Sequence, residues 1–141
     1  MTPNQSLREC QVFRRLTDEH LKKVEGLCSR EVYEAGGYIF RAGDAAERLF
    51  VLEEGKVALQ LELPMRHAEL RKRVTVDTIA KNEFFGWSSL VEPYVYTLTA
   101  ICLRQATVLV INAAKLSSLF QSNCSIAYEV LYGVVNVMGA R

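Results

Sequence analysis

An alternation of apolar and polar residues in the middle of the chain most constrains its fold. In Lys56–Leu63 every second side chain is apolar, which is the period of a half-buried β-strand. Turn residues such as Gly43, Gly55 and Pro93 separate this segment from its neighbours. Four further apolar runs have the length of strands: Leu49–Leu52, Arg73–Ile79, Tyr96–Leu103 and Ala106–Ile111. Many short strands between turns predict a β-sandwich or barrel.

The segment before the first strand has the features of a helix. Thr17 is a favourable N-cap, and two acidic residues follow it in the first turn. The apolar residues of this segment then recur at helical spacing: Leu21, Val24, Leu27 and Cys28. We therefore expect a helix from Thr17 to Cys28. A smaller apolar group before it predicts a short helix or turn against the core: Val12, Phe13 and Leu16.

The end of the chain returns to helical patterns. Asn112 is placed to cap a helix over residues 113–120. A second helix is expected from about Ser125 to the end, interrupted at Gly133 and Gly139. The arrangement predicts one domain over 1–141, with helical segments at 12–28 and 113–141 around strands at 29–112. A chain of 141 residues that is half apolar is long enough for one core.

Charge and hydropathy exclude several classes of protein. The 17 Lys and Arg against 16 Asp and Glu leave no basic excess for nucleic acid. The longest apolar stretches, 106–111 and 132–140, fall short of the roughly 20 residues that cross a bilayer. The N-terminus has no apolar core of a signal peptide. We therefore expect a cytoplasmic protein that contacts neither a membrane nor, by this domain alone, nucleic acid.

Metal and catalytic sites are not indicated. The four cysteines are widely spaced and form no CxxC pair, so we expect free thiols: Cys10, Cys28, Cys102 and Cys124. His20 falls in the predicted helix and His67 in a polar loop, so neither fits a catalytic arrangement. The sequence predicts a protein that is not an enzyme and holds no metal or cofactor.

Four motifs in order resemble the cyclic-nucleotide-binding domain family, the sensory domain of catabolite-activator-type regulators. They are Gly37–Asp44, Leu49–Val57, Glu83–Gly86 and the strand Ala106–Ile111 with the helix after it. The resemblance covers roughly 12–141. It implies a mainly β fold, a jelly-roll sandwich of about eight strands with flanking N-terminal and C-terminal helices. It also implies a non-catalytic regulatory function. The helix-turn-helix domain of the family's transcription factors has no counterpart here, so no DNA-binding domain is expected.

The resemblance fails at two ligand contacts of the phosphate-binding cassette. In family members that bind a cyclic nucleotide, a Glu after the cassette Gly holds the ribose, and a later Arg pairs with the phosphate. Here Trp87 stands at the Glu position and Tyr94 at the Arg position. A phosphate without its Arg loses a charge-assisted contact of about 1.5–3 kcal/mol. We therefore do not expect cyclic AMP to bind in the usual way.

Three hypotheses remain for the cassette. One is a pocket for a different small molecule, whose class includes anions because the turn from Gly86 offers free N–H groups. Another is a ligand-free cassette, plugged by Trp87, in a dimerisation or protein-interaction module. The third is a non-standard cyclic nucleotide site. The expected ligand-binding residues are Phe85, Gly86, Trp87, Ser88, Ser89, Tyr94, Tyr96 and Thr97. A Trp87 ring that lines an open cavity favours the first hypothesis, and a ring that fills it favours the second.

The last helix is too apolar for a helix that buries only one face. Apolar residues on more than one side require a second burial surface. Those we assign to a partner helix are Val130, Leu131, Val134 and Met138. We therefore expect a homodimer through this helix, which is the dimer interface of the family. The alternative is that both faces are buried within one chain.

Overall fold

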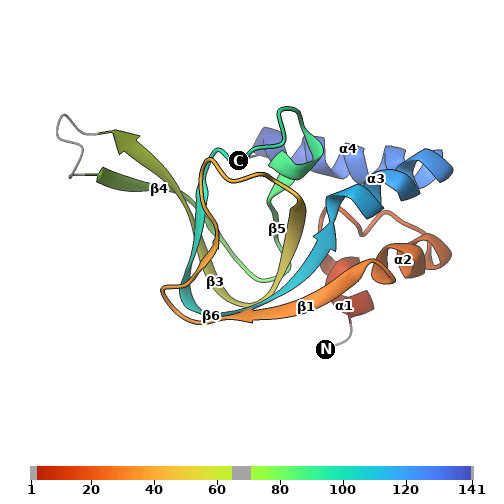
Figure 1. The fold of residues 1–141 in the computed structure, drawn as a ribbon. Coiled ribbons are helices and arrows are strands. Elements are labelled where there is room, and N and C mark those ends of the chain that lie inside the picture. The colour runs from red at the N-terminus through yellow and green to blue at the C-terminus, as the bar shows by residue number, and fades with distance from the viewer. Residues whose placement is uncertain (1–2, 65–70, 141) are drawn as a thin grey trace.

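The strands form one antiparallel sheet that curls into a roll (Figure 1). The computed structural model of the protein describes residues 3–64 and 71–140. Strands pair in the order β1–β6–β3–β4, with β2 added to β6 and β5 added to β3. Their bounds are β1 Cys28–Tyr33, β2 Tyr38–Phe40, β3 Arg48–Pro64, β4 Arg71–Ile79, β5 Phe84–Phe85 and β6 Thr99–Asn112. The predicted mainly β architecture with flanking helices is confirmed.

The α-helices gather on one side of the roll, and the β3–β4 hairpin projects from the other (Figure 1). A short 3-10 helix, η1, follows β5 directly. The helical bounds are α1 Pro3–Glu9, α2 Asp18–Glu25, η1 Trp87–Leu90, α3 Ala113–Ser122 and α4 Cys124–Ala140. Over the described residues, no helix combines the length and the hydropathy needed to cross a bilayer.

Two pairs of predicted strands are each one continuous strand, so six strands replace the expected eight or so. The runs on either side of Gly55 both belong to β3, and the runs on either side of Arg104 both belong to β6. Register shifts between Leu52 and Val57 let the β3–β6 ladder continue past the irregularity. Gly55 has a φ of 101°, and a Cβ there would lie 2.4 Å from the Gln105 carbonyl oxygen. A glycine therefore bends this strand without ending it.

The N-terminal helix prediction is correct at its start and wrong at its end. The Thr17 hydroxyl accepts a hydrogen bond from the His20 N–H at 3.2 Å, which is the expected cap. The helix ends at Glu25, because Cys28 already pairs with Ile111 as the first residue of β1. The sequence reasoning also missed α1, which precedes the predicted helical segment.

The prediction that Gly133 and Gly139 interrupt the last helix is wrong, since α4 runs through both. A Cβ at Gly133 would lie 2.8 Å from Cα of Val12 and 2.9 Å from its carbonyl oxygen. The missing side chain therefore lets α4 approach the turn that precedes α2. Gly139 faces open space, with nothing within 4 Å of a Cβ.

Two clusters of buried side chains form the core, and β5 lies on their boundary. The helical cluster consists of Leu7, Cys10, Val12, Phe13, Leu16, Leu21, Val24, Leu49, Val51, Phe84, Leu109, Ile111, Leu116, Ile126, Val130, Val134 and Val137. The roll cluster consists of Ile39, Phe40, Ala46, Phe50, Leu52, Val57, Leu59, Ile79, Phe85, Tyr96, Ala100, Cys102, Ala106, Val108 and Val110. Because successive side chains of a strand point to opposite faces, Phe84 joins one cluster and Phe85 the other.

Candidate ligand-binding site

The segment from β5 through η1 follows a course that its sequence imposes. Phe84 and Phe85 pair with Val51 and Phe50 of β3. Gly86 then takes a left-handed conformation, with φ 87°, and a Cβ there would lie 2.9 Å from a ring carbon of Phe50. Only glycine fits such a position without strain. The chain continues into η1, where the Ser89 hydroxyl donates to the Gly86 carbonyl oxygen at 2.9 Å.

A small cavity lies between η1 and the roll. We call it the cassette cavity. Its lining residues are Phe40, Leu59, Gly86, Trp87, Ser88, Tyr96, Thr97 and Leu98. Its volume is about 30 Å³, which is the space that one water molecule takes in the liquid. Sites for small organic molecules are typically about 300–1,000 Å³. The cavity in this conformation is therefore too small for a nucleotide.

Aromatic rings of the chain occupy the interior of the roll beside this cavity. The rings of Phe40 and Tyr96 stack with centroids 3.8 Å apart, and those of Phe50 and Phe85 with centroids 5.1 Å apart. The Tyr96 hydroxyl donates to the Arg48 carbonyl oxygen at 2.5 Å. The Arg48 backbone N–H in turn donates to the Tyr96 oxygen at 3.4 Å. Burial raises the pKa of Tyr96 and outweighs the lowering effects of this N–H and of the Arg48 charge.

Trp87 contacts both regions of the molecule. Its ring lines the cassette cavity, and it also packs against the helical cluster, with its centroid 6.4 Å from that of Phe84. The side chain is half-buried, whereas Phe40 and Tyr96 are buried. Trp87 is therefore the link between the cavity and the helices.

The structure brings together some of the predicted ligand-binding residues and separates others. Those that line the cassette cavity are Gly86, Trp87, Ser88, Tyr96 and Thr97. Phe85 lies in the roll cluster beneath them. Ser89 and Tyr94 line a different cavity of about 440 Å³ at the start of α3, and the Tyr94 side chain is 48% exposed.

Three lining residues were not singled out from the sequence: Phe40, Leu59 and Leu98. Leu59 belongs to the alternating run, so the period of two places it on the inner face, but only the closed roll brings it to the cassette. Phe40 lies within the Gly37–Asp44 motif, so its membership of a family motif could have marked it as a candidate.

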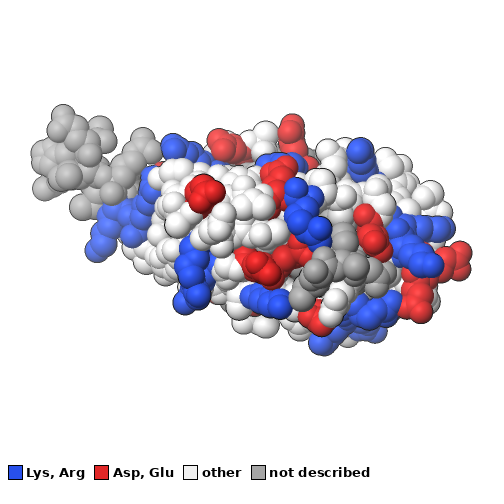
Figure 2. Space-filling view, turned by 90° about the horizontal axis from the view of Figure 1, so that it is seen from below, with Lys and Arg blue, Asp and Glu red and all other residues white. Residues whose placement is uncertain are grey.

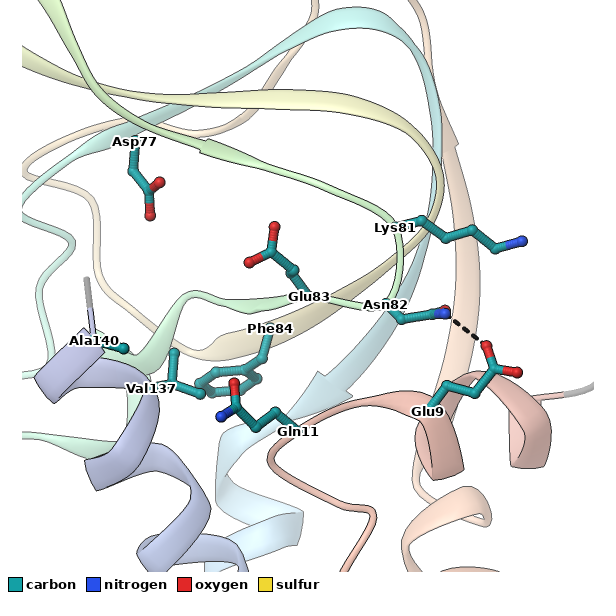
Figure 3. A pocket seen from close by; sticks show the side chains of 9 residues that line it. All are labelled: Glu9, Gln11, Asp77, Lys81, Asn82, Glu83, Phe84, Val137 and Ala140. Atoms are coloured by element: carbon teal, nitrogen blue, oxygen red, sulfur yellow. Dashed lines mark hydrogen bonds between the residues drawn. The ribbon is translucent and has the colours of Figure 1, made fainter.

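A larger cavity lies between the end of α1, the β4–β5 turn and the end of α4 (Figure 3). It measures about 490 Å³ and is lined by Glu9, Gln11, Asp77, Lys81, Asn82, Glu83, Phe84, Val137 and Ala140. The Asn82 amide donates to a Glu9 carboxylate oxygen at 2.6 Å and joins the end of α1 to the β4–β5 turn. The described residues contain no group of three acidic, Cys or His side chains arranged to hold a metal ion. This cavity contains none of the cassette residues, so its size does not make it the cassette site.

The predicted dimer residues divide between the two sides of α4. Val130 and Val134 are buried in the protein's own helical cluster, whereas Leu131 and Met138 are exposed. The exposed residues belong to an apolar stripe that we call the α4 stripe: Tyr128, Leu131, Tyr132, Val135 and Met138. The rings of Tyr128 and Tyr132 stack within it, with centroids 6.0 Å apart.

Charges of both signs are interspersed on the face of the molecule seen from below (Figure 2). This face therefore presents no single-sign field of the kind that nucleic acid requires.

Comparison with known proteins identifies the family. The family model of the cyclic nucleotide-binding domain matches residues 30–123, about two thirds of the chain. The cGMP-dependent protein kinase isozyme 1 of Drosophila melanogaster is 28% identical over 97 residues. That match covers 69% of this chain and only 12% of the kinase. The curated relatives are therefore much longer proteins that share this region.

Solved structures agree over nearly the whole chain. A protein of Geobacter metallireducens, described as a candidate cyclic nucleotide-binding protein, is 29% identical with a TM-score of 0.84. The similarity covers 100% of this chain and 98% of that one. The N-terminal domain of a transcriptional regulator from Streptomyces coelicolor is 24% identical with a TM-score of 0.78, covering 96% and 91% of the two chains. The jelly-roll fold and the motifs around Gly86 thus have one explanation: this chain belongs to the cyclic nucleotide-binding domain family, as a domain of the regulatory, sensor type.

Proposed function

We propose that a small molecule other than cyclic AMP in its usual binding mode binds at the cassette cavity and controls the position of the C-terminal helices. The observation that carries this proposal is the double contact of Trp87, which lines the cavity and packs against Phe84. η1 also lies against α3. A displacement of η1 would therefore alter the contacts of α3, the helix that precedes α4. The domain acts by binding, and we assign no catalytic step to it.

The ligand exerts control only if it binds one arrangement of η1 and the helices better than the other. The arrangement with the small cavity is the one that binds poorly, because about 30 Å³ does not admit an organic molecule. A ligand that enters must displace part of the wall. Trp87 is the largest side chain of that wall that is not fully buried, and its displacement disturbs its contact with Phe84.

The output we propose is a homodimer through α4. The α4 stripe is exposed and has the i, i+3, i+4, i+7 spacing of a helix face that packs on another helix. A second copy of the chain offers the same apolar stripe, which is the requirement of a two-fold symmetric interface. Val130 and Val134 contribute indirectly, because they hold α4 on the helical cluster of its own chain with the α4 stripe exposed.

The small volume of the cavity also favours the alternative function, a ligand-free interaction module. A thermal-shift screen of cyclic nucleotides, linear nucleotides, phosphorylated metabolites, organic acids and neutral aromatic compounds separates the two. We expect a saturable rise in melting temperature for one class, because a ligand that binds only the native state stabilises it. Hydrogen exchange of α3 and α4 should change with the same compound. A flat screen across every class would rule out ligand control and leave the interaction module.

The dimer is tested by light scattering during size-exclusion chromatography of the wild type and two variants. Leu131→Glu places a charge within the α4 stripe, and we expect it to give a monomer. Asn136→Glu places the same charge on the exposed surface of α4 outside the stripe, and we expect it to remain a dimer. A wild-type protein that elutes as a monomer at high concentration would contradict the proposed interface.

A further inference from the structure

We infer that the ligand of the cassette cavity is neutral and largely apolar, with one or two hydrogen-bonding groups, and that it enters by displacing Trp87. This inference rests on the proposed function and gives the chemistry of the same site. None of the eight lining residues is charged. Five of them present aromatic or aliphatic surface: Phe40, Leu59, Trp87, Tyr96 and Leu98. An ionised ligand loses its hydration in such a cavity and gains no counter-charge there.

The arginines in the elements around the cavity are engaged elsewhere. Arg48 of β3 donates to a Glu31 carboxylate oxygen at 2.9 Å and to the Tyr33 hydroxyl at 3.4 Å. Arg41 follows Phe40, but its guanidinium lies over the Tyr38 ring, 4.1 Å from the centroid. Neither side chain lines the cavity. An anionic ligand would have to take Arg48 from its own carboxylate, which disfavours anions further.

Two hydroxyl groups remain available for a neutral ligand. Ser88 of η1 and Thr97 before β6 both line the cavity, and the structure records no side-chain hydrogen bond for either. The Tyr96 hydroxyl is already used, because it donates to the Arg48 carbonyl oxygen. A few polar groups in an apolar wall are the usual way in which a pocket orients a small molecule. We therefore expect the hydroxyl groups of Ser88 and Thr97 to form the hydrogen bonds to the ligand.

The movable part of the wall is identified by burial. Phe40, Leu59 and Tyr96 are buried in the roll cluster. Phe40 and Leu59 belong to β2 and β3, and the Tyr96 ring stacks on Phe40. Trp87 is half-buried on a four-residue helix that follows the left-handed Gly86. The cavity holds only about 30 Å³, so part of its wall has to move when a ligand enters. Among the lining residues that are not buried, Trp87 has the largest side chain, and we assign the movement to it. Trp87 is also the single tryptophan of the chain, so tryptophan fluorescence reports on this site alone.

The test is a fluorescence titration of the full chain with two matched pairs of probes. Phenol is compared with phenyl phosphate, and adenosine with cyclic AMP. We expect a neutral member to change the Trp87 emission saturably and to bind at least about tenfold more tightly than its anionic partner. Ser88→Ala and Thr97→Val should each weaken the neutral probe by up to about tenfold. Thr78→Val, an exposed position outside the cavity, should not weaken it.

The outcomes separate the inference from the function on which it rests. Equal or tighter binding of phenyl phosphate or cyclic AMP would overturn the neutral ligand while leaving a ligand-controlled domain. Saturable binding of a neutral probe that leaves Trp87 emission unchanged would overturn the displacement of Trp87. If no probe changes the emission, the inference fails. The proposed function fails with it only when the wider thermal-shift screen is flat as well.

Discussion

Phe84 and Phe85 are identical neighbours in the chain, yet they lie in two cores that are held together differently. Phe85 stacks on Phe50 in the roll cluster, where paired strands hold every neighbour in register. Phe84 contacts Phe13 at 6.4 Å between ring centroids in the helical cluster, to which helices from both ends of the chain contribute. The helices are joined to the roll chiefly by side-chain packing. We therefore expect the helical cluster to be the part that the proposed ligand moves.

Truncation of either phenylalanine gives the largest effect we predict. Phe84→Ala and Phe85→Ala should each lower the free energy of unfolding by about 3–5 kcal/mol, because each empties a fully buried site. The two differ in location. Hydrogen exchange should accelerate mainly in α3 and α4 for Phe84→Ala and mainly in the roll for Phe85→Ala. The same exchange pattern in both variants would contradict a division into two cores.

A methyl group at Gly133 tests the contact that holds α4. Gly133→Ala should lower the free energy of unfolding by about 1–3 kcal/mol, because the new Cβ meets the Val12 backbone at 2.8 Å. Gly139→Ala is the matched control, since nothing lies within 4 Å of a Cβ there. It should raise the stability by up to about 1 kcal/mol, the gain in helix propensity. Chemical denaturation of the two variants measures both effects, and equal effects would argue against the close approach.

A buried carboxylate joins the two regions and makes their attachment dependent on pH. Glu53 of β3 accepts hydrogen bonds from the Ser6 hydroxyl of α1 at 2.7 Å and from Arg30 at 2.5 Å. Burial by itself raises the pKa of Glu53, but these hydrogen bonds and the Arg30 charge outweigh burial and lower it. A lowered carboxyl pKa stabilises the fold above the unfolded value of about 4.3 and loses that effect as the pH falls through the folded value.

Stability should therefore decline as the pH falls below about 4.3, and Glu53→Gln should flatten part of that decline. At neutral pH, Ser6→Ala should lower the stability by about 1–2 kcal/mol, because it removes a hydrogen bond to a charged group. Thermal denaturation of the wild type and the two variants over a series of pH values measures this. If the loss of stability at low pH is the same in Glu53→Gln as in the wild type, other carboxylates control the decline.

The reactivity of the cysteine thiols compares the opening of the two clusters without any substitution, and it is the smallest effect that we predict. Cys124 is exposed and should react with a thiol reagent at mildly alkaline pH without unfolding. Burial, together with the charges of Glu25 and Glu53, raises the pKa of Cys28 to about 12, and burial raises the pKa of Cys102. Both should react only when their region opens. Faster labelling of Cys28 at the helical cluster than of Cys102 in the roll is expected, and the reverse order would contradict the proposed mobility.

Local signals predicted local structure well. Thr17 and Asn112 cap helices as expected. Gly133 led to the wrong prediction of an interrupted helix, because its low helix propensity was the only signal in the sequence. Its reason is a close contact with Val12, which lies more than a hundred residues away in the chain.

The candidate site was predicted only in part, because some of its features depend on contacts between distant segments. The cassette position and Trp87 follow from motif spacing, so the sequence reasoning placed them. The separation of Tyr94 from the cavity depends on how residues 91–97 turn between η1 and β6. Tyr94 takes a φ of 57° there, and its carbonyl oxygen accepts a hydrogen bond from the Ala46 N–H at 2.7 Å. That course depends on a partner from another loop, which no local pattern shows.

The sequence by itself determined the family, the mainly β roll and the helix caps. Each of these depends on residue type and on spacing within a short segment. Only the tertiary structure decided that the strands merge, that α4 is continuous, and that Trp87 joins a small cavity to the helical cluster. These features depend on which distant side chains compete for the same space, because close packing is a property of the assembled core.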